Sequence, residues 1–484
     1  MKRKILLSVI TIFLMLFLPN SLATGKNKSY LNYFYHQNLE WSSCYTHFQC
    51  SVFKVPIDYL NPNTGTFKLK VVRAVKTNGR VPVLINPGGP GDSAINFLFS
   101  AVNYFPKAFL QKYQLVAFDQ RGVGFSNPVR CLTDAEDEKL INLWIDLNTP
   151  DTISSLKKES QDVTRKCLSK VKNLIHYSTW ESAADMDILR ANLNLSKLNY
   201  YGASYGTQLG TDYLEQFPKN AGRLVLDGAV DPNQSTIDAT LTQAIGFDRE
   251  YLRFTKKYPR WNLDTVIPLL NASKINPVEK NGRKLTYPLF VTALADTLYQ
   301  PQYGWPVLDS GLQSLVTDSN LSKLLAASDD YYERNNDGKF SNLIDISFIM
   351  SCDDNADRPQ YSAISKNLAN FKKLAPIFGE NNLGSVVSCN SWPTPVHADK
   401  KYPKTTNTSP VLIIGNTNDP ATPLKNAYNL SKLISNSRLL TLERDGHAGF
   451  ARGSSCIDTF VTKYFSDGAL PAHGTICNLD VTSA

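Results

Sequence analysis

The segment LNYYGASYGTQLGTDYLEQF, residues 198–217, decides the fold. Its centre, GASYG at 202–206, places a serine between two glycines, with an apolar run before it and an amphipathic run after it. A serine on a tight turn from strand to helix exposes its hydroxyl at the edge of a sheet, where it can act as a nucleophile. Because so short a pattern also arises by chance, the surrounding sequence must support the prediction of a hydrolase that uses Ser204.

Short β-rich segments recur along the chain, separated by helical or loop-rich sequence. Each is nearly continuous in apolar residues, as expected for parallel strands that are covered on both faces. Residues 411–442 contain two such segments around a helical pattern, which is typical of a strand–helix–strand unit, and 67–74 fits an antiparallel edge strand. The pattern predicts an α/β fold with a mostly parallel central sheet and helices on both faces. The six segments are 81–86, 115–119, 198–201, 224–227, 411–415 and 438–442.

Two stretches interrupt this alternation. Residues 131–180 are charged and helical in pattern, whereas 232–400 contain many aromatic residues and proline breaks without clear strand alternation. The chain between the first and second halves of the sheet is therefore about a hundred residues longer than a minimal fold of this class requires. We predict a core that spans 24–231 and 401–484, and a large, mainly helical cap at 232–400 that covers the active site.

The N-terminus has the three parts of a secretory signal peptide. Basic residues at 2–4 precede an apolar run at 5–18, and small residues end at Ala23. The run is short for a membrane anchor, and no later stretch is long and apolar enough to span a bilayer. We expect residues 1–23 to be removed after Ala23 and the protein to be secreted or periplasmic.

Charge gives no indication of a nucleic-acid partner. The formal net charge is +8, and removal of the three basic residues at 2–4 leaves +5. This excess is spread along the chain and forms no basic cluster, so nucleic-acid binding is not predicted.

Eight cysteines in an exported chain predict four disulfides, because an oxidising compartment favours paired thiols. Pairing neighbours in order would close four local loops, although spacing alone does not choose among the alternatives. Metal binding is the weaker interpretation, since the chain has no C-x-x-C or H-E-x-x-H spacing. The positions are Cys44, Cys50, Cys131, Cys167, Cys352, Cys389, Cys456 and Cys477.

A nucleophilic serine needs a histidine to accept its proton and an acid to orient that histidine. In α/β-hydrolases the three residues follow one another as serine, acid and histidine. Asp419 comes just after the strand at 411–415, and His447 lies in a glycine-flanked loop after the last strand. We therefore predict that Asp419 and His447 reach the sheet edge that carries Ser204.

Other residues compete for these roles. Asp445 is too near His447 in the chain to approach its Nδ1 easily, and Asp227 lies in an Asp-Gly turn that can simply end a strand. Asp231 also follows the strand before the insertion. We therefore favour Asp419 as the acid and keep the other three aspartates as alternatives. None of the other histidines follows a clear strand. These are His36, His47, His176, His397 and His473.

Residues 86–91, NPGGPG, follow the first core strand and suit an oxyanion hole. Their glycines let the backbone approach the substrate, and backbone N–H groups stabilise the charge that develops on a carbonyl oxygen. We predict Gly89 and Tyr205 as the donors, with Gly88 as the substitute. Such a cluster alone would usually mark a turn, but its order relative to Ser204 favours the catalytic interpretation.

Together these motifs resemble the secreted tripeptidyl aminopeptidases and related prolyl aminopeptidases of the α/β-hydrolase fold, from about residue 40 to the C-terminus. Prolyl aminopeptidases commonly carry histidine where this chain has Pro87, so the tripeptidyl branch is the better match. The resemblance implies release of short peptides from a free N-terminus, with an acidic group that binds the α-amine. The segments that carry it are 86–91, 118–124, 201–206, 225–228, 418–420 and 446–447.

Asp353 and Asp354 are the candidates for the amine-binding acids, because paired carboxylates suit an ammonium group. A solvated loop held by a disulfide is the competing interpretation. Asp119 and Arg121 are expected to organise the loop beside the site. The expected partners are peptides with a free N-terminus, and the mechanism requires no cofactor. The same triad cleaves esters, so a carboxylesterase or lipase is the alternative.

Overall fold

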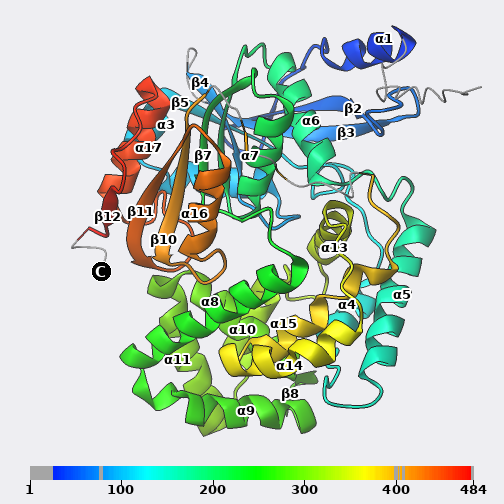
Figure 1. The fold of residues 1–484 in the computed structure, drawn as a ribbon, viewed down its shortest axis with the longest axis vertical. Coiled ribbons are helices and arrows are strands. Elements are labelled where there is room, and N and C mark those ends of the chain that lie inside the picture. Colours follow the sequence, from blue (N-terminus) through cyan, green and yellow to red (C-terminus); the bar gives the residue numbers. More distant parts are fainter. Residues whose placement is uncertain (1–24, 76–79, 397–401, 403, 406–408, 481–484) are drawn as a thin grey trace, which may run out of the picture.

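The structure, a computed structural model, describes residues 25–75, 80–396, 402, 404–405 and 409–480. Ten strands form one sheet in the order β1-β2-β3-β5-β4-β6-β7-β10-β11-β12 (Figure 1). The strands from β5 to β12 in this order run parallel, and β1, β2 and β3 pair antiparallel. The predicted signal peptide lies outside the described residues.

Seven of the ten strands, all except β1, β2 and β12, coincide with predicted segments and extend several of them by a few residues. Their bounds are β1 Ser42–Cys44, β2 Phe48–Pro56, β3 Thr66–Ala74, β4 Val81–Asn86, β5 Tyr113–Phe118, β6 Leu198–Ala203, β7 Ala221–Asp227, β10 Val411–Asn418, β11 Ser437–Asp445 and β12 Ile476–Asn478. The predicted unit at 411–442 is confirmed, because β10 and β11 pair in parallel and the helix α16, Leu424–Leu433, connects them. The predicted α/β fold is confirmed as well.

One expectation for the sheet was wrong. The segment at 67–74 does form an antiparallel strand, β3, but β3 lies between β2 and β5 and is not an edge. The edge is formed by the short β1, which pairs with β2 through the hairpin closed by Cys44 and Cys50. The prediction did not include these two strands because it relied on nearly continuous apolar runs, whereas β2 alternates buried and exposed residues over much of its length.

Helices cover both faces of the sheet, because alternate residues of each central strand point to opposite sides. In β10, Leu412 packs with α2, Ala94–Tyr104, α3, Lys107–Lys112, and α17, Ser455–Asp467. Its neighbour Ile413 packs on the other side with α6, Thr179–Asn192, α7, Tyr205–Gln216, and α16. The core is therefore continuous through the sheet, and the strands hold their carboxyl ends in a fixed row. The short N-terminal helix α1, Gly25–Phe34, contacts β2.

A second group of helices lies beside the sheet (Figure 1). Most of them pack in clusters of their own, whereas the buried apolar residues of α13 belong to the core of the sheet. We call this group the helical region; it comprises α4 Asp134–Ile141, α5 Thr152–Lys170, α8 Thr236–Lys257, α9 Leu263–Ile275, α10 Tyr287–Tyr299, α11 Pro301–Asp318, α12 Ser322–Tyr331, α13 Leu343–Asp354, α14 Ser362–Leu374 and α15 Gly379–Ser385. It also contains the short hairpin of β8, Glu279–Lys280, and β9, Arg283–Lys284, and the turns η1, Pro259–Trp261, and η2, Ser388–Ser391. None of its helices, nor any other in the described ranges, is long and apolar enough to cross a membrane.

Both stretches that interrupt the strand pattern contribute to this region. Ile141 packs in the same cluster as the buried residues of α10, and Leu156 packs with Ile364 and Phe371 of the 232–400 stretch. These apolar side chains of α4 and α5 are buried against inserted helices and not against the sheet. The cap predicted at 232–400 therefore leaves out two helices that pack with it, and its division from the core stays a prediction.

The structure contains four disulfides, and they join the cysteines that are neighbours in the chain. Cys352–Cys389 links α13 to η2, and Cys131–Cys167 links the approach to α4 with α5. Cys456–Cys477 links α17 to β12. Two of the four crosslinks therefore lie at the helical region, and two at the ends of the sheet.

Candidate active site

Ser204 lies on the turn between β6 and α7. Its backbone adopts φ 55° and ψ −127°, a conformation that costs free energy for a residue with a side chain. The neighbouring backbone is so close that a Cβ at Gly202 would lie 2.4 Å from the Gly206 oxygen, and one at Gly206 would lie 2.9 Å from Asn86 Oδ1. Both glycines are therefore required, and together they hold the strained serine at the carboxyl end of β6.

The end of β7 connects Ser204 to His447. The Ser204 N–H donates to the Asp227 carbonyl over 2.9 Å. The next residue, Gly228, has φ 63°, and a Cβ there would lie 3.0 Å from Cε1 of the His447 ring. The serine backbone and the histidine ring therefore contact the same two-residue turn, although they are far apart in sequence.

Asp419 and His447 form a buried pair at the ends of β10 and β11. The His447 Nδ1 lies 2.8 and 2.9 Å from the two Asp419 carboxylate oxygens. The carboxylate also accepts the N–H groups of Ala421 and Thr422, over 3.0 and 2.8 Å, and is almost fully buried. An acid fixed this way holds the proton of His447 on Nδ1 and leaves Nε2 as the acceptor.

The Nε2 atom of His447 is buried and has no hydrogen-bond partner among the described residues. Nor does a hydrogen bond join Ser204 to His447 in this part of the chain. Serine–histidine contacts are often loose in the absence of substrate and tighten when it binds. The unpaired Nε2 is therefore the atom of the ring that can take up a proton.

Asp231, one of the three competing acids, accepts from the Asn429 side chain over 2.8 Å. The other two also have partners of their own. Asp227 accepts the N–H groups of Gly449 and Phe450, over 2.8 and 2.9 Å, and the Tyr201 hydroxyl over 3.0 Å. It thereby holds the loop that follows His447, and its burial raises the pKa of its carboxyl. Asp445 accepts from Asn418 over 2.8 Å at the partly exposed end of β11. Neither has a hydrogen bond to His447 in the described residues.

The NPGGPG loop after β4 lies against the serine turn. A Cβ at Gly88 would lie 2.7 Å from the Ser204 Cβ and 3.2 Å from the Tyr205 nitrogen. The Gly88 N–H donates to Asn86 Oδ1 over 3.0 Å. Within the described chain the N–H groups of Gly89 and Tyr205 have no acceptor. These two donors are free for a substrate oxygen, whereas the substitute, Gly88, is already engaged.

Asp119 holds the start of the helix that follows this loop. Its carboxylate accepts from the Ser93 hydroxyl over 2.9 Å, from the Ile95 N–H over 3.0 Å and from the Phe125 N–H over 2.9 Å. Burial raises the pKa of Asp119 to about 6. Arg121 instead forms a fully buried ion pair with Asp185 at 2.7 Å, away from the triad. The hydrogen bonds of Asp119 tie the start of α2 to the 118–124 segment.

The helical region contacts His447 directly, through residues that the sequence did not single out. The carbonyl of Tyr299, at the end of α10, accepts the His447 N–H over 2.8 Å, and the two rings pack edge to face with centroids 5.5 Å apart. Gln300 donates to the His447 carbonyl over 2.9 Å and accepts from Arg444 over 2.7 Å. Thr422 Oγ1 lies 3.2 Å from His447 Nδ1. Thr422 was likewise not among the predicted site residues.

The predicted amine-binding pair lies at the end of α13. The Asp353 oxygens accept from Trp392 Nε1 over 2.7 Å and from the Tyr177 N–H over 3.1 Å, and the side chain is almost fully buried. The Asp354 oxygens accept from the N–H and hydroxyl of Thr179, over 2.6 and 2.5 Å. Both carboxylates are thus already hydrogen-bonded to the fold, and burial raises the pKa of Asp354 to about 7.

The described residues include no group of three or more metal-ligating side chains. The site therefore consists of a serine, a buried histidine–aspartate pair and two free N–H donors at one edge of a parallel sheet. This set can carry out nucleophilic attack on a carbonyl.

Comparison with known proteins agrees with this geometry. A family model described as the alpha/beta hydrolase fold matches residues 81–453. This chain belongs to the α/β-hydrolase family. It is 31% identical over 458 residues to serine protease Hip1 of Mycobacterium tuberculosis, with 88% of this chain and 87% of the relative covered. It is a serine hydrolase of this family, with Ser204 on the expected turn.

Two further relatives carry different names. Carboxylesterase B of Mycobacterium tuberculosis is 31% identical over 452 residues, with 89% of this chain and 86% of the relative covered. Tripeptidyl aminopeptidase of Streptomyces lividans is 25% identical over 468 residues, with 91% and 86% covered. The resemblance to the tripeptidyl aminopeptidases is therefore confirmed, while the type of bond that this chain cleaves is left open by the three names.

Proposed function

We propose that the protein is a serine aminopeptidase that releases short peptides from free N-termini. The observation that carries the hydrolytic part is the buried Asp419–His447 pair, whose free Nε2 faces no competing partner in the described chain. The peptidase part is supported by the relatives named serine protease and tripeptidyl aminopeptidase.

In the proposed reaction, His447 Nε2 takes the proton of the Ser204 hydroxyl as its oxygen attacks the scissile carbonyl. The negative charge that develops on the carbonyl oxygen is stabilised by the N–H groups of Gly89 and Tyr205. His447 then donates the proton to the leaving amine, and Ser204 stays acylated. Water, deprotonated by the same histidine, cleaves the acyl-enzyme. Asp419 holds the ring in the required orientation throughout.

The acid that binds the substrate amine is a separate proposal. Asp353 and Asp354 are weakened as candidates by the hydrogen bonds that they already accept. Asp92 has none in the described chain, and a Cβ at Gly89 would lie 3.4 Å from its Cγ. Burial and the nearby Glu333 raise the pKa of Asp92 to about 6. The raised pKa means that the charged form of Asp92 is disfavoured, and an ammonium group beside it would stabilise that form. Asp92 is therefore the better candidate.

The test compares substrates that differ only at the N-terminus. Free and N-acetylated tripeptide p-nitroanilides are assayed beside p-nitrophenyl esters of short acids, with wild type and the Ser204→Ala variant. An aminopeptidase hydrolyses the free tripeptide at least about tenfold faster than the acetylated one, as expected for one lost charge-assisted contact. Equal rates for the free and acetylated peptides would refute the proposal.

A carboxylesterase is the second candidate, because one relative of equal identity carries that name. The same assay separates the two functions. A carboxylesterase would cleave the esters and neither peptide, and loss of ester cleavage in Ser204→Ala would still assign the reaction to this serine.

We also propose that the protein is secreted or periplasmic, after cleavage behind Ala23. The four disulfides support this location, because such crosslinks persist in oxidising compartments. The intact mass of the protein recovered outside the cytoplasm should match a chain that begins at Thr24. A mass that includes residues 1–23 would contradict the proposed cleavage.

A further inference from the structure

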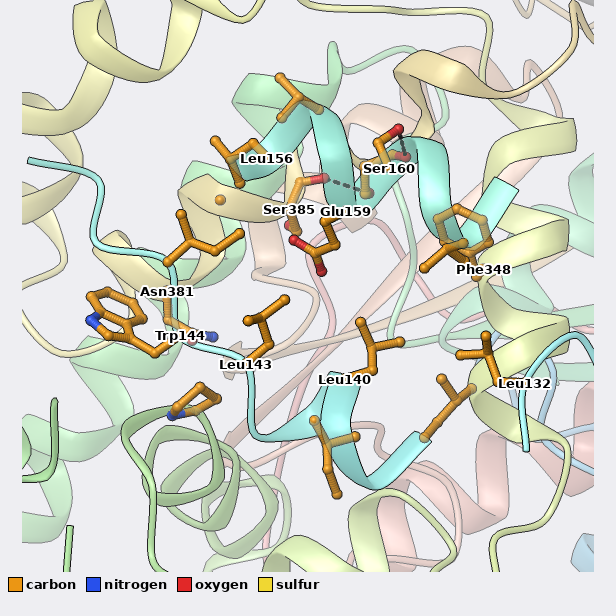
Figure 2. A pocket seen from close by; sticks show the side chains of 18 of the residues that line it. Leu132, Leu140, Leu143, Trp144, Leu156, Glu159, Ser160, Phe348, Asn381 and Ser385 are labelled. Carbon is orange, nitrogen blue, oxygen red and sulfur yellow. Dashed lines mark hydrogen bonds between the residues drawn. The ribbon is translucent and has the colours of Figure 1, made fainter. Parts of the chain in front are cut away.

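The helical region contains a cavity that none of the triad residues lines. Its volume is about 310 Å³, at the lower end of the range for small-molecule sites. Its walls are mostly apolar side chains from α4, α5 and α13 and from the segment that follows α4 (Figure 2). The residues that define it best are Leu140, Leu143, Trp144, Leu156 and Phe348.

The helix α13 separates this cavity from the candidate active site. Ile346 faces the catalytic loops, since a Cβ at Gly91 or at Gly122 would lie 2.9 Å from its side chain. Asp345 and Phe348, on the same helix, line the cavity. The cavity is therefore a different site from the one that holds Ser204.

One carboxylate in the cavity has no partner. Glu159, on α5, points into the cavity toward Leu140 and Leu143 (Figure 2). Among the residues that the structure describes, none donates a hydrogen bond to Glu159 or pairs with its charge. Burial alone raises the pKa of Glu159 to about 7, and no nearby cation offsets the effect. A carboxylate in apolar surroundings is costly unless something pairs with it.

The other charged groups around the cavity are already paired. Asp345 accepts from the N–H groups of Cys131 and Leu132 and lies 3.1 Å from Arg130. Glu380 is paired with Lys274 at 2.6 Å. The carboxylate of Glu159 is therefore the one charge in the cavity that no described residue compensates.

The cavity adjoins a second hollow that is lined by many of the same residues, including Glu159. Charged side chains from α4 and α5 surround this outer hollow. Lys166 is paired with Glu136 at 2.9 Å, and Lys158 with Asp162 at 3.2 Å. Lys139 is exposed. The outer hollow offers a route by which a small molecule can reach Glu159 from solvent.

We propose that this cavity binds an aliphatic primary amine, with the alkyl chain against the leucines and Trp144 and the ammonium group on Glu159. The chemistry follows from the cavity: apolar walls bind a hydrocarbon chain, and the one unpaired carboxylate selects a cation over a neutral or anionic group. The site is independent of the proposed aminopeptidase reaction.

Three probes of equal chain length test the charge preference: octylamine, octan-1-ol and octanoate, titrated by calorimetry at about pH 8, where Glu159 is ionised. We expect wild type to bind octylamine about tenfold more tightly than octanol, since a hydrogen bond to a charged group is stronger than one between neutral groups. Octanoate should bind more weakly than octanol. Equal binding of octylamine and octanol would overturn the proposal, as would absence of octylamine binding at millimolar concentration.

Two variants locate the site. Glu159→Gln should lose the preference for octylamine and still bind octanol, while the control Glu40→Gln, at an exposed position, should behave as wild type. Gly384→Leu should abolish binding of both, because Gly384 lines the cavity and a Cβ there meets no atom within 4 Å. Undiminished octylamine binding by Glu159→Gln, or by folded Gly384→Leu, would refute the assignment. If Gly384→Leu does not fold, the glutamate pair of variants alone decides.

Discussion

The carboxyl edge of the sheet and the cavity of the helical region treat buried charge in opposite ways. At the sheet edge, Asp119, Asp227 and Asp419 each accept at least three hydrogen bonds, so their positions are fixed. In the cavity, Glu159 faces apolar walls without a partner. A saturated network builds a preorganised catalytic geometry, whereas an unsatisfied carboxylate leaves a free-energy cost that a ligand can remove.

The largest effect should come from the acid of the triad. Asp419→Asn is expected to lower kcat about 10⁴-fold, because an amide no longer holds His447 in the tautomer that accepts the serine proton. Asp445→Asn, a matched change at the carboxyl end of β11, should alter kcat less than about threefold, since Asp445 has no hydrogen bond to a catalytic residue. Steady-state kinetics on the preferred substrate measures both. Similar losses in the two variants would show that the wrong aspartate has been assigned.

A smaller loss of kcat is expected at Asp227, which holds the loop that carries His447 but has no hydrogen bond to the histidine itself. In Asp227→Asn, the amide NH₂ must face one of the two N–H donors of Gly449 and Phe450, so the loop that carries His447 shifts. A displacement of about 1 Å costs about 10²-fold in kcat. The decisive readout is the change in kcat compared with the change in KM, because a shift of this loop should lower kcat and leave KM nearly unchanged. An unchanged kcat would mean that this network does not position His447.

The contact between the two regions should matter less again. Gln300→Ala removes the side chain that joins the His447 carbonyl to Arg444. We expect kcat to fall about tenfold, equivalent to about 1.4 kcal/mol. Gln313→Ala, on α11 of the same region, serves as the control. If Gln300→Ala retains full kcat, the helical region does not help to hold the histidine.

Glu159 gives the smallest effect, and it depends on pH. Its folded-state pKa of about 7 lies above the ordinary 4.5, so its contribution to stability is present below about pH 4.5 and is lost as the pH rises through about 7. Glu159→Gln should therefore unfold like wild type at about pH 4.5 and be more stable, by on the order of 1 kcal/mol, at about pH 8.

Urea unfolding of wild type and Glu159→Gln at the two pH values measures this difference, with Glu40→Gln as the control. A difference that does not change with pH would show that the carboxylate is solvated and not buried in the cavity. Addition of octylamine at about pH 8 should stabilise wild type more than Glu159→Gln.

The sheet could be predicted from sequence because central strands, buried on both faces, are apolar throughout, as 411–415 illustrates. The order of Ser204, Asp419 and His447 was also readable, since each follows a strand that ends at the same edge. The contacts of Tyr299 and Gln300 with His447 could not be predicted. They depend on how α10 packs against the sheet, and no local pattern in the sequence encodes that packing.

The cavity was equally hidden in the sequence. Glu159 lies in a charged stretch, where a glutamate is expected to be solvated, and only the packing of α4, α5 and α13 surrounds it with leucines. The amine-binding candidates show the opposite case. Asp353 and Asp354 looked available in the sequence, but Trp392, Tyr177 and Thr179 already use their oxygens.

Covalent labelling tests the central claim, that Ser204 is the nucleophile activated by His447, most directly. The protein is treated with a serine-reactive aryl phosphonate, digested and examined by mass spectrometry. One adduct is expected, on the peptide that contains Ser204, and it should disappear in Ser204→Ala and form far more slowly in His447→Ala. An adduct on another serine, or labelling that persists in Ser204→Ala, would contradict the account.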